Sequence, residues 1–277
     1  MTDLGPLPRF NKPPVSEVVI GIQFEPLANI SAVQLGLLWQ SFSGRFPRVE
    51  QHPQLDHQIE RKGVRAQQTP TISFVSGAEL APRIWMISTD DSELLQVQGD
   101  RFIRNWRRYR DGSVPYPSFE RLWPEFARDL TTFEKFVGEN GLGELKVDQC
   151  EVTYINLIWP CHVWSEHGQL DRVFVGCANG YPELTGRPAE AIGVRTKHEI
   201  VDDTGEFVGR LFVEANSAFA GAEKKMAFAL QLVARGRPLG AGRGGIDRFA
   251  AMAHELIVRS FAAITTPEMH KVWERTA

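Results

Sequence analysis

The sequence has few cysteines, and they are not arranged to bind a metal or to form a disulfide framework. Only Cys150, Cys161 and Cys177 occur among 277 residues, an odd number with no CxxC spacing. This pattern argues against a structural zinc site and favours buried thiols in a reducing compartment. We therefore expect no metal and no cofactor.

The chain also lacks a strong excess of one charge and a long apolar run. Its 31 basic and 34 acidic residues give a formal net charge of -3, which argues against a generally nucleic-acid-coated surface or a polybasic membrane anchor. Any anion site must therefore be local. No segment is apolar over the length of a signal peptide or a membrane span, so we expect a soluble, cytoplasmic protein with no membrane contact.

No local motif supplies a catalytic centre. The GxSxG and SxxK patterns of hydrolases are missing, and His254-Glu255 begins like a zinc-protease helix but has valine at position 258, where the second ligand is needed. The glycine-rich stretch Gly240–Gly245, which contains Arg243, precedes a predicted helix and could bind an anion there. It lacks the lysine of a P-loop, and a flexible surface loop is the alternative. We assign no catalytic residue.

The apolar periodicity predicts an α+β fold with a mostly antiparallel sheet covered on one face by helices. Strands are expected near 15–25, 83–88, 94–106, 144–159, 191–202, 206–219 and 226–233, and helices begin at Ser31, Ser118 and Asp247. The strands cluster instead of alternating with helices, which disfavours a parallel sheet. We expect a lead-in over 1–14 and two pseudo-repeated halves, 15–143 and 144–277. The polar stretch 49–77 is expected to be a long connection with one short strand near 72–75.

The segment Leu94–Arg110 is the most distinctive part of the sequence. Gly99-Asp100 predicts a turn or bulge, after which Phe102, Arg104, Trp106 and Arg108 share one face of a strand. Arginine forks can bind carboxylates or phosphates and can stack on flat groups. The candidate partner-binding residues are Arg101, Arg104, Asn105, Trp106, Arg107 and Arg108. An exposed strand with solvated arginines is the alternative.

Four segments, PPVSEVVIGIQFEPL, LLQVQGDRFIRNWRRY, CEVTYINLIWP and AHELIVRSFAAITTPEMHKVW, resemble a sporadically distributed family of uncharacterised bacterial proteins. The resemblance spans nearly the whole chain and implies no reaction. It implies that a shared site or a shared core contains Gln98, Asn105, Trp106, Tyr154, Asn156, His254 and Trp273.

These observations leave three hypotheses about function. The first is a binding or assembly protein whose arginine-rich strand meets an acidic protein surface, a nucleotide or a nucleic acid, with a homodimer covering a sheet edge. The second is an enzyme with a cleft between the halves that uses Glu151, Asn156 and His254. The third is a structural subunit in which the arginines form internal ion pairs. Secondary site candidates are Gln98, Tyr154, Asn156, Arg243 and His254.

Overall fold

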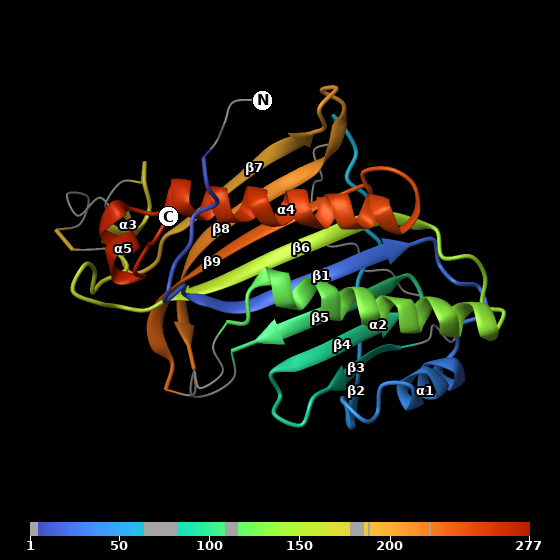
Figure 1. The fold of residues 1–277 in the computed structure, drawn as a ribbon. Helices are drawn as coiled ribbons and strands as arrows, with labels where there is room; N and C mark the ends of the chain where they lie inside the picture. Colours follow the sequence, from blue (N-terminus) through green and yellow to red (C-terminus); the bar gives the residue numbers. More distant parts are fainter. Residues whose placement is uncertain (1–4, 64–81, 109–115, 178–185, 188, 222) are drawn as a thin grey trace.

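The computed structural model describes residues 5–63, 82–108, 116–177, 186–187, 189–221 and 223–277. These residues form one nine-stranded antiparallel sheet, in the order β2-β3-β4-β5-β1-β6-β9-β8-β7, together with five helices (Figure 1). The strands are β1 (Val15–Phe24), β2 (Arg48–His52), β3 (Arg83–Ile87), β4 (Glu93–Gln98), β5 (Arg101–Arg107), β6 (Val147–Ile158), β7 (Gly193–Val201), β8 (Phe207–Ala220) and β9 (Lys225–Gly236). The predicted α+β class with an antiparallel sheet is confirmed.

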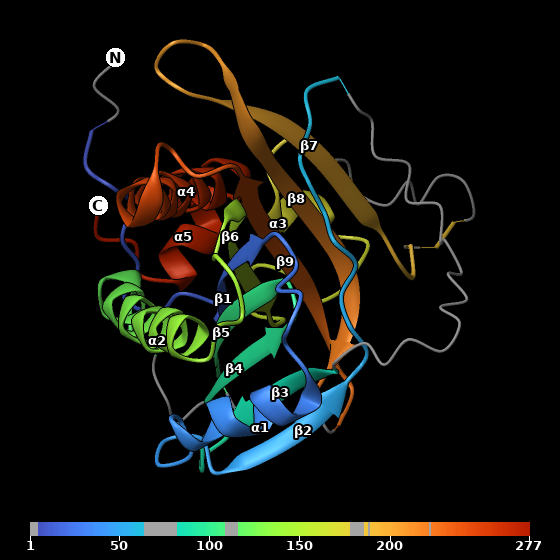
Figure 2. The same ribbon diagram turned by 90° about the vertical axis from the view of Figure 1, so that its right-hand side faces the viewer.

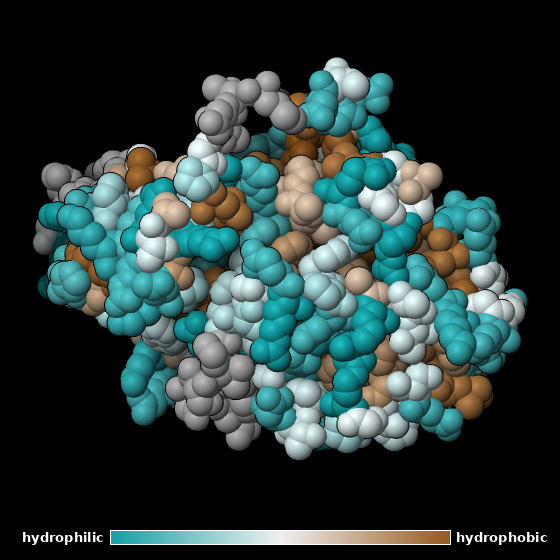
Figure 3. Space-filling model, viewed as in Figure 1, coloured by the Kyte–Doolittle hydropathy of each residue, from teal (hydrophilic) through white to brown (hydrophobic). Residues whose placement is uncertain are grey.

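The two long helices, α2 (Phe119–Glu139) and α4 (Gly242–Ile264), lie along the same face of the sheet (Figures 1 and 2). We call this the helix face. Alternate residues of each strand point towards it, as Val18, Ile20 and Ile22 of β1 do, and all three are at most 3% exposed. The surface seen from this side is largely hydrophilic, because each helix directs its apolar stripe inwards (Figure 3).

The remaining helices are short. They are α1 (Ala32–Gln40), α3 (Leu170–Val173) and α5 (Pro267–Val272). Ser31 is the N-cap of α1 and Ser118 the N-cap of α2, as predicted. Within the described residues, no helix combines the length and the apolar composition needed to cross a bilayer.

The opposite side of the sheet, the polar face, is crossed by residues 53–62, which we call the crossing segment (Figure 2). Gln58 in this segment and Gln23 in β1 bind each other through two hydrogen bonds of 2.9 and 2.7 Å. Glu60 accepts a hydrogen bond of 2.6 Å from Arg210 in β8. The crossing segment therefore bridges strands from the two ends of the chain.

Three sequence expectations need correction or lie beyond the described residues. α4 begins at Gly242 instead of Asp247, so most of the predicted glycine loop is the first turn of a helix. Gly245 packs against the carbonyl of Gly240, where an added Cβ would lie 2.0 Å from the oxygen, so this glycine permits close packing. The polar connection also contributes β2. This edge strand was not predicted, because its side chains are polar and mostly exposed. The strand expected at 72–75 lies outside the described residues.

Candidate functional site

Arg104 and Trp106 point to the helix face and are each 2% exposed, which contradicts their predicted contact with a partner. The Arg104 guanidinium donates hydrogen bonds to Glu93 (2.6 Å), Glu125 (2.7 Å) and Asp129. Its charge is therefore neutralised inside the monomer. Internal ion pairs of this kind are what the third hypothesis, a structural subunit, predicted for the arginines. The physical reason is strand alternation, which sends neighbouring arginines of β5 to opposite faces.

A cavity of about 540 Å³ lies on the polar face, and we call it the polar-face cavity. Apolar side chains from three adjacent strands, Val19, Leu94 and Ile103, contribute to its lining. Apolar lining with a few convergent polar groups is the usual composition of a small-molecule site. The charged and polar residues around it are Glu17, Gln23, Gln54, Asp56, Gln58, Arg83, Trp85, Gln96, Arg101, Asn105, Arg107, Gln149, Glu151 and Arg235.

Three arginines of this cavity, Arg83, Arg101 and Arg107, have no carboxylate at ion-pair distance within the described residues. Their hydrogen bonds go to neutral oxygens instead: Arg101 donates to the Gln23 side chain (2.6 Å) and Arg107 to the backbone carbonyl of Asp91 (3.3 Å). In all three, Nε is buried without a hydrogen-bond partner. Burial lowers the pKa of Arg83 and of Arg101, which reflects the cost of keeping these charges out of water. An anion in the cavity would offset that cost.

A chain of hydrogen bonds crosses four strands along one wall of the cavity. Arg83 donates to Gln96 (3.1 Å), Gln96 donates to Asn105 (2.8 Å), and Asn105 donates to Glu17 (2.6 Å). Burial raises the pKa of Glu17, against the opposing effects of the Asn105 hydrogen bond and the Arg107 charge. Asn105, a predicted binding residue, therefore holds the carboxyl group that competes with any incoming anion for Arg107.

The crossing segment is fastened beside this cavity by three polar residues of the sheet. Gln98 binds both backbone groups of Leu55, with two hydrogen bonds of 2.9 Å. The ring of His57 lies between Asp100 (Nδ1–Oδ2, 2.7 Å) and Asp148 (Nε2–Oδ2, 3.0 Å). Gln98, a secondary candidate from the sequence, is 1% exposed and holds the crossing segment in place.

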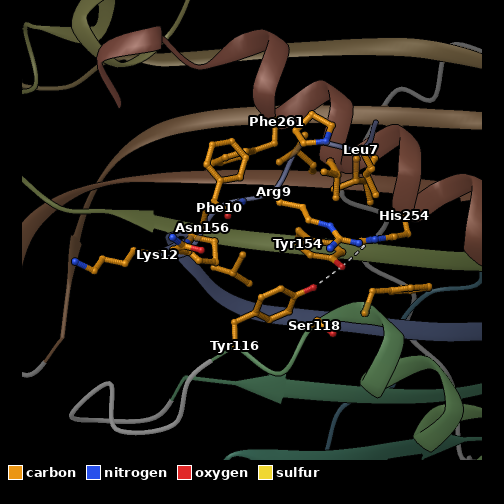
Figure 4. A pocket seen from close by; sticks show the side chains of 18 of the residues that line it. Leu7, Arg9, Phe10, Lys12, Tyr116, Ser118, Tyr154, Asn156, His254 and Phe261 are labelled. Carbon is orange, nitrogen blue, oxygen red and sulfur yellow. Dashed lines mark hydrogen bonds between the residues drawn. The ribbon is translucent and has the colours of Figure 1, made fainter. Parts of the chain in front are cut away.

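A second and larger hollow, of about 1030 Å³, lies on the helix face between the N-terminal residues 7–13, α2 and α4. We call it the helix-face pocket (Figure 4). Tyr154, Asn156 and His254, three secondary candidates, come together in its wall. The hydroxyls of Tyr116 and Tyr154 are 2.9 Å apart, and the Tyr154 hydroxyl is 3.0 Å from Nδ1 of His254.

The combination of Glu151, Asn156 and His254 predicted for an enzyme is not assembled. Glu151 lines the polar-face cavity, whereas Asn156 and His254 line the helix-face pocket on the other side of the sheet. Glu151 is also paired with Arg235 at 2.7 Å. Strand alternation again explains the separation, because residues 151 and 156 of β6 differ by an odd number.

The two remaining arginine candidates have structural contacts. Arg108 donates to the carbonyl of Pro13 (3.4 Å) at the helix-face pocket. Arg243 joins α4 to α2 through Thr131 (2.9 Å) and Glu134 (3.0 Å). Trp273, from the segments that resemble the bacterial family, is 5% exposed and belongs to the core. No cluster of metal-ligating side chains occurs in the part of the chain that the structure describes.

Glu17, Arg83 and Gln96 are the site residues that the sequence did not single out. The alternation of apolar and other residues over 15–24 does place Glu17 on the outer face of its strand. The sequence contains no signal that β1 pairs with β5, which brings Glu17 opposite Arg107. Arg83 and Gln96 reach the cavity through the equally non-local pairing of β3, β4 and β5.

In comparisons with known proteins, no family model and no curated protein matches this chain. The resemblance to the bacterial family therefore stays a prediction.

Proposed function

We propose that this protein binds a small anionic molecule in the polar-face cavity. The observation that carries the proposal is the presence of three guanidinium groups, those of Arg83, Arg101 and Arg107, that face one cavity without a carboxylate partner in the described residues. All three residues are partly buried, and a charge held partly out of water is stabilised when a ligand supplies the opposite charge. Arginine suits planar, two-pronged binding of carboxylate or phosphate.

The size of the cavity favours a small molecule over the acidic protein surface or nucleic acid that the sequence also allowed. A volume of about 540 Å³ lies within the range of small-molecule sites. The crossing segment lies beside the cavity and is held by Gln98 and His57. The formal net charge of -3 provides no general attraction for a polyanion.

We also infer that the two halves of the chain are pseudo-repeats that meet at the centre of the sheet. Each half begins with a central strand, β1 or β6, and places its last strand, β5 or β9, next to it. Each half then ends in a long helix, α2 or α4. This interpretation places the polar-face cavity mainly on strands of the first half, with Glu151 and Arg235 from the second half at its border.

The test is calorimetric titration with inorganic phosphate and AMP, compared with a single-stranded oligonucleotide. The Arg107→Gln variant should lose about tenfold to a hundredfold in affinity for the bound probe, because a hydrogen bond to a charged group contributes about 1.5–3 kcal/mol. Arg195→Gln is the matched control: its side chain is 57% exposed on β7, outside the cavity lining. It should bind as the wild type does.

Three outcomes would contradict the proposal. The first is that neither phosphate nor AMP binds at millimolar concentration. The second is equal losses in Arg107→Gln and Arg195→Gln, which would point to a general charge effect. The third is preferential binding of the oligonucleotide with a steep salt dependence, which would indicate contacts along a polyanion instead of a cavity ligand.

A further inference from the structure

The helix-face pocket offers a different kind of site from the polar-face cavity. It lies across the sheet, beneath the N-terminal residues 7–13. Apolar side chains form much of its wall, including Val15, Phe119, Ile257 and Phe261. The N-terminal residues are fixed by backbone hydrogen bonds from Asn11 and Lys12 to the C-terminal end of the chain, both 3.1 Å long. The pocket is therefore bounded by fixed chain segments.

Three polar side chains of this pocket form one continuous hydrogen-bonded chain, and the charged residues Arg9, Lys12, Arg108 and Glu120 also line the pocket. It runs from Tyr116 through Tyr154 to Nδ1 of His254, with heavy-atom distances of 2.9 and 3.0 Å (Figure 4). The His254 ring is stacked on Phe119, with ring centroids 4.2 Å apart and planes inclined by 4°. This stacking fixes the ring orientation, and no residue in the described part of the chain bonds Nε2, which is the end of the hydrogen-bonded chain.

The chain can be oriented in two ways. If Tyr116 donates to Tyr154 and Tyr154 donates to Nδ1, the His254 Nε2 carries the proton and is a donor. If Nδ1 carries the proton, every bond reverses, Nε2 becomes an acceptor and the Tyr116 hydroxyl is free to donate. In either orientation the three side chains present both a donor and an acceptor.

The three groups are also uncharged near neutral pH. Burial raises the pKa of both tyrosine hydroxyls, and burial lowers the pKa of His254 against the opposing charges of Glu120 and Glu255. The chain is consequently suited to a neutral hydroxyl or carbonyl group.

Asn156 supplies a second, independent polar group. It is 2% exposed, and its amide nitrogen donates to the carbonyl of Leu230 (3.2 Å). Within the described residues its side-chain oxygen has no hydrogen-bond partner, although the residue lines the pocket. This oxygen can accept a hydrogen bond from a ligand hydroxyl.

We propose that the helix-face pocket binds an uncharged, largely apolar small molecule through an oxygen-bearing group recognised by Tyr116, Tyr154 and His254. The proposal does not depend on anion binding at the other face. It involves no covalent step, and either side of the sheet can be occupied without the other.

The experiment compares two probes that differ by one hydroxyl, 2-naphthol and naphthalene, titrated by fluorescence. The wild type should prefer 2-naphthol by about fivefold to tenfold, the value of one net hydrogen bond of about 1 kcal/mol. The Tyr154→Phe variant should reduce the preference to less than twofold and leave naphthalene affinity unchanged. His198→Gln, an exposed change on β7, is the control and should keep the preference.

A pocket-filling variant confirms the location. Val258→Trp should weaken both naphthyl probes at least tenfold, because Val258 lines the pocket, and should not alter phosphate or AMP binding. Circular dichroism and melting temperature verify that the variants fold. The proposal is overturned if neither probe binds the wild type, if naphthalene binds as tightly as 2-naphthol, or if Tyr154→Phe keeps the preference.

Discussion

Replacing Arg104 by alanine is expected to destabilise the protein because it leaves buried Asp129 without its main partner. Asp129 is fully buried and would keep only Arg45 and Arg128, whose side chains are 42% and 59% exposed. Breaking a buried ion pair by removing one partner costs about 3–5 kcal/mol. The remaining ion pairs of Asp129 with Arg45 and Arg128 place the expected loss of stability near the lower end of this range, about 3 kcal/mol. Glu93 and Glu125 retain contact with water at 26% and 20% exposure and add less.

Urea unfolding and thermal melting measure this loss directly. In a large domain each kcal/mol shifts the melting temperature by about 2–4 °C, so Arg104→Ala should melt about 6–12 °C lower than the wild type. Arg48→Ala is the control, because Arg48 forms an ion pair with Asp91 while its side chain is 51% exposed. An exposed pair contributes only about 0–1 kcal/mol.

The paired variant Arg104→Met with Asp129→Leu separates the ion pair from the loss of packing. Replacing both members of a buried pair by apolar residues is often neutral or stabilising, so the double variant should recover most of the lost stability. An Arg104→Ala protein with wild-type stability and weakened anion binding would refute this reasoning. That result would return Arg104 to the partner-binding surface predicted from the sequence.

Three further predictions test other parts of the structure. Because the pKa of Glu17 is higher in the folded state than in the unfolded state, ionisation of its carboxyl group lowers the stability of the protein as the pH rises past the unfolded-state pKa. The Glu17→Gln variant should therefore have a higher melting temperature than the wild type at pH 8 and a similar one at pH 4. Gly209→Ala should lower the urea midpoint by the equivalent of about 3 kcal/mol, since its Cβ would lie 2.0 Å from the carbonyl oxygen of Arg235. A thiol reagent should modify Cys150 only after denaturation, because burial raises the pKa of that thiol, whereas the partly exposed Cys161 should react in the folded protein.

The fold class could be predicted because its signals are local. Alternation identified most strands, and the serines at 31 and 118 marked the helix starts. The turn at Gly99-Asp100 separates β4 from β5, as expected. The edge strand β2 was missed because its side chains are mostly exposed and give no apolar alternation.

The candidate site could be predicted only in part, because its contacts are not local. Asp129 lies at helical spacing between Phe126 and Phe133, on the apolar side of α2, but it is 25 residues from Arg104, and nothing in the sequence identifies Arg104 as its partner. Glu17 and Arg107 meet only through the register of β1 and β5. The residues of the arginine-rich segment were predicted to lie on one surface, whereas in the sheet they are divided between the helix face and the polar face.

Strand β5 shows this division most clearly. Its even-numbered residues, Phe102, Arg104 and Trp106, are at most 2% exposed on the helix face, where polarity is tolerated only with full ion pairing. Its odd-numbered members, such as Arg101 and Arg107, face a cavity and, within the described residues, have no carboxylate at ion-pair distance. Substitutions at even positions should therefore change stability first, and those at odd positions should change ligand binding first. The arginine-rich sequence is therefore divided between the two faces of the sheet, and the parity of the residue number indicates which face each arginine occupies.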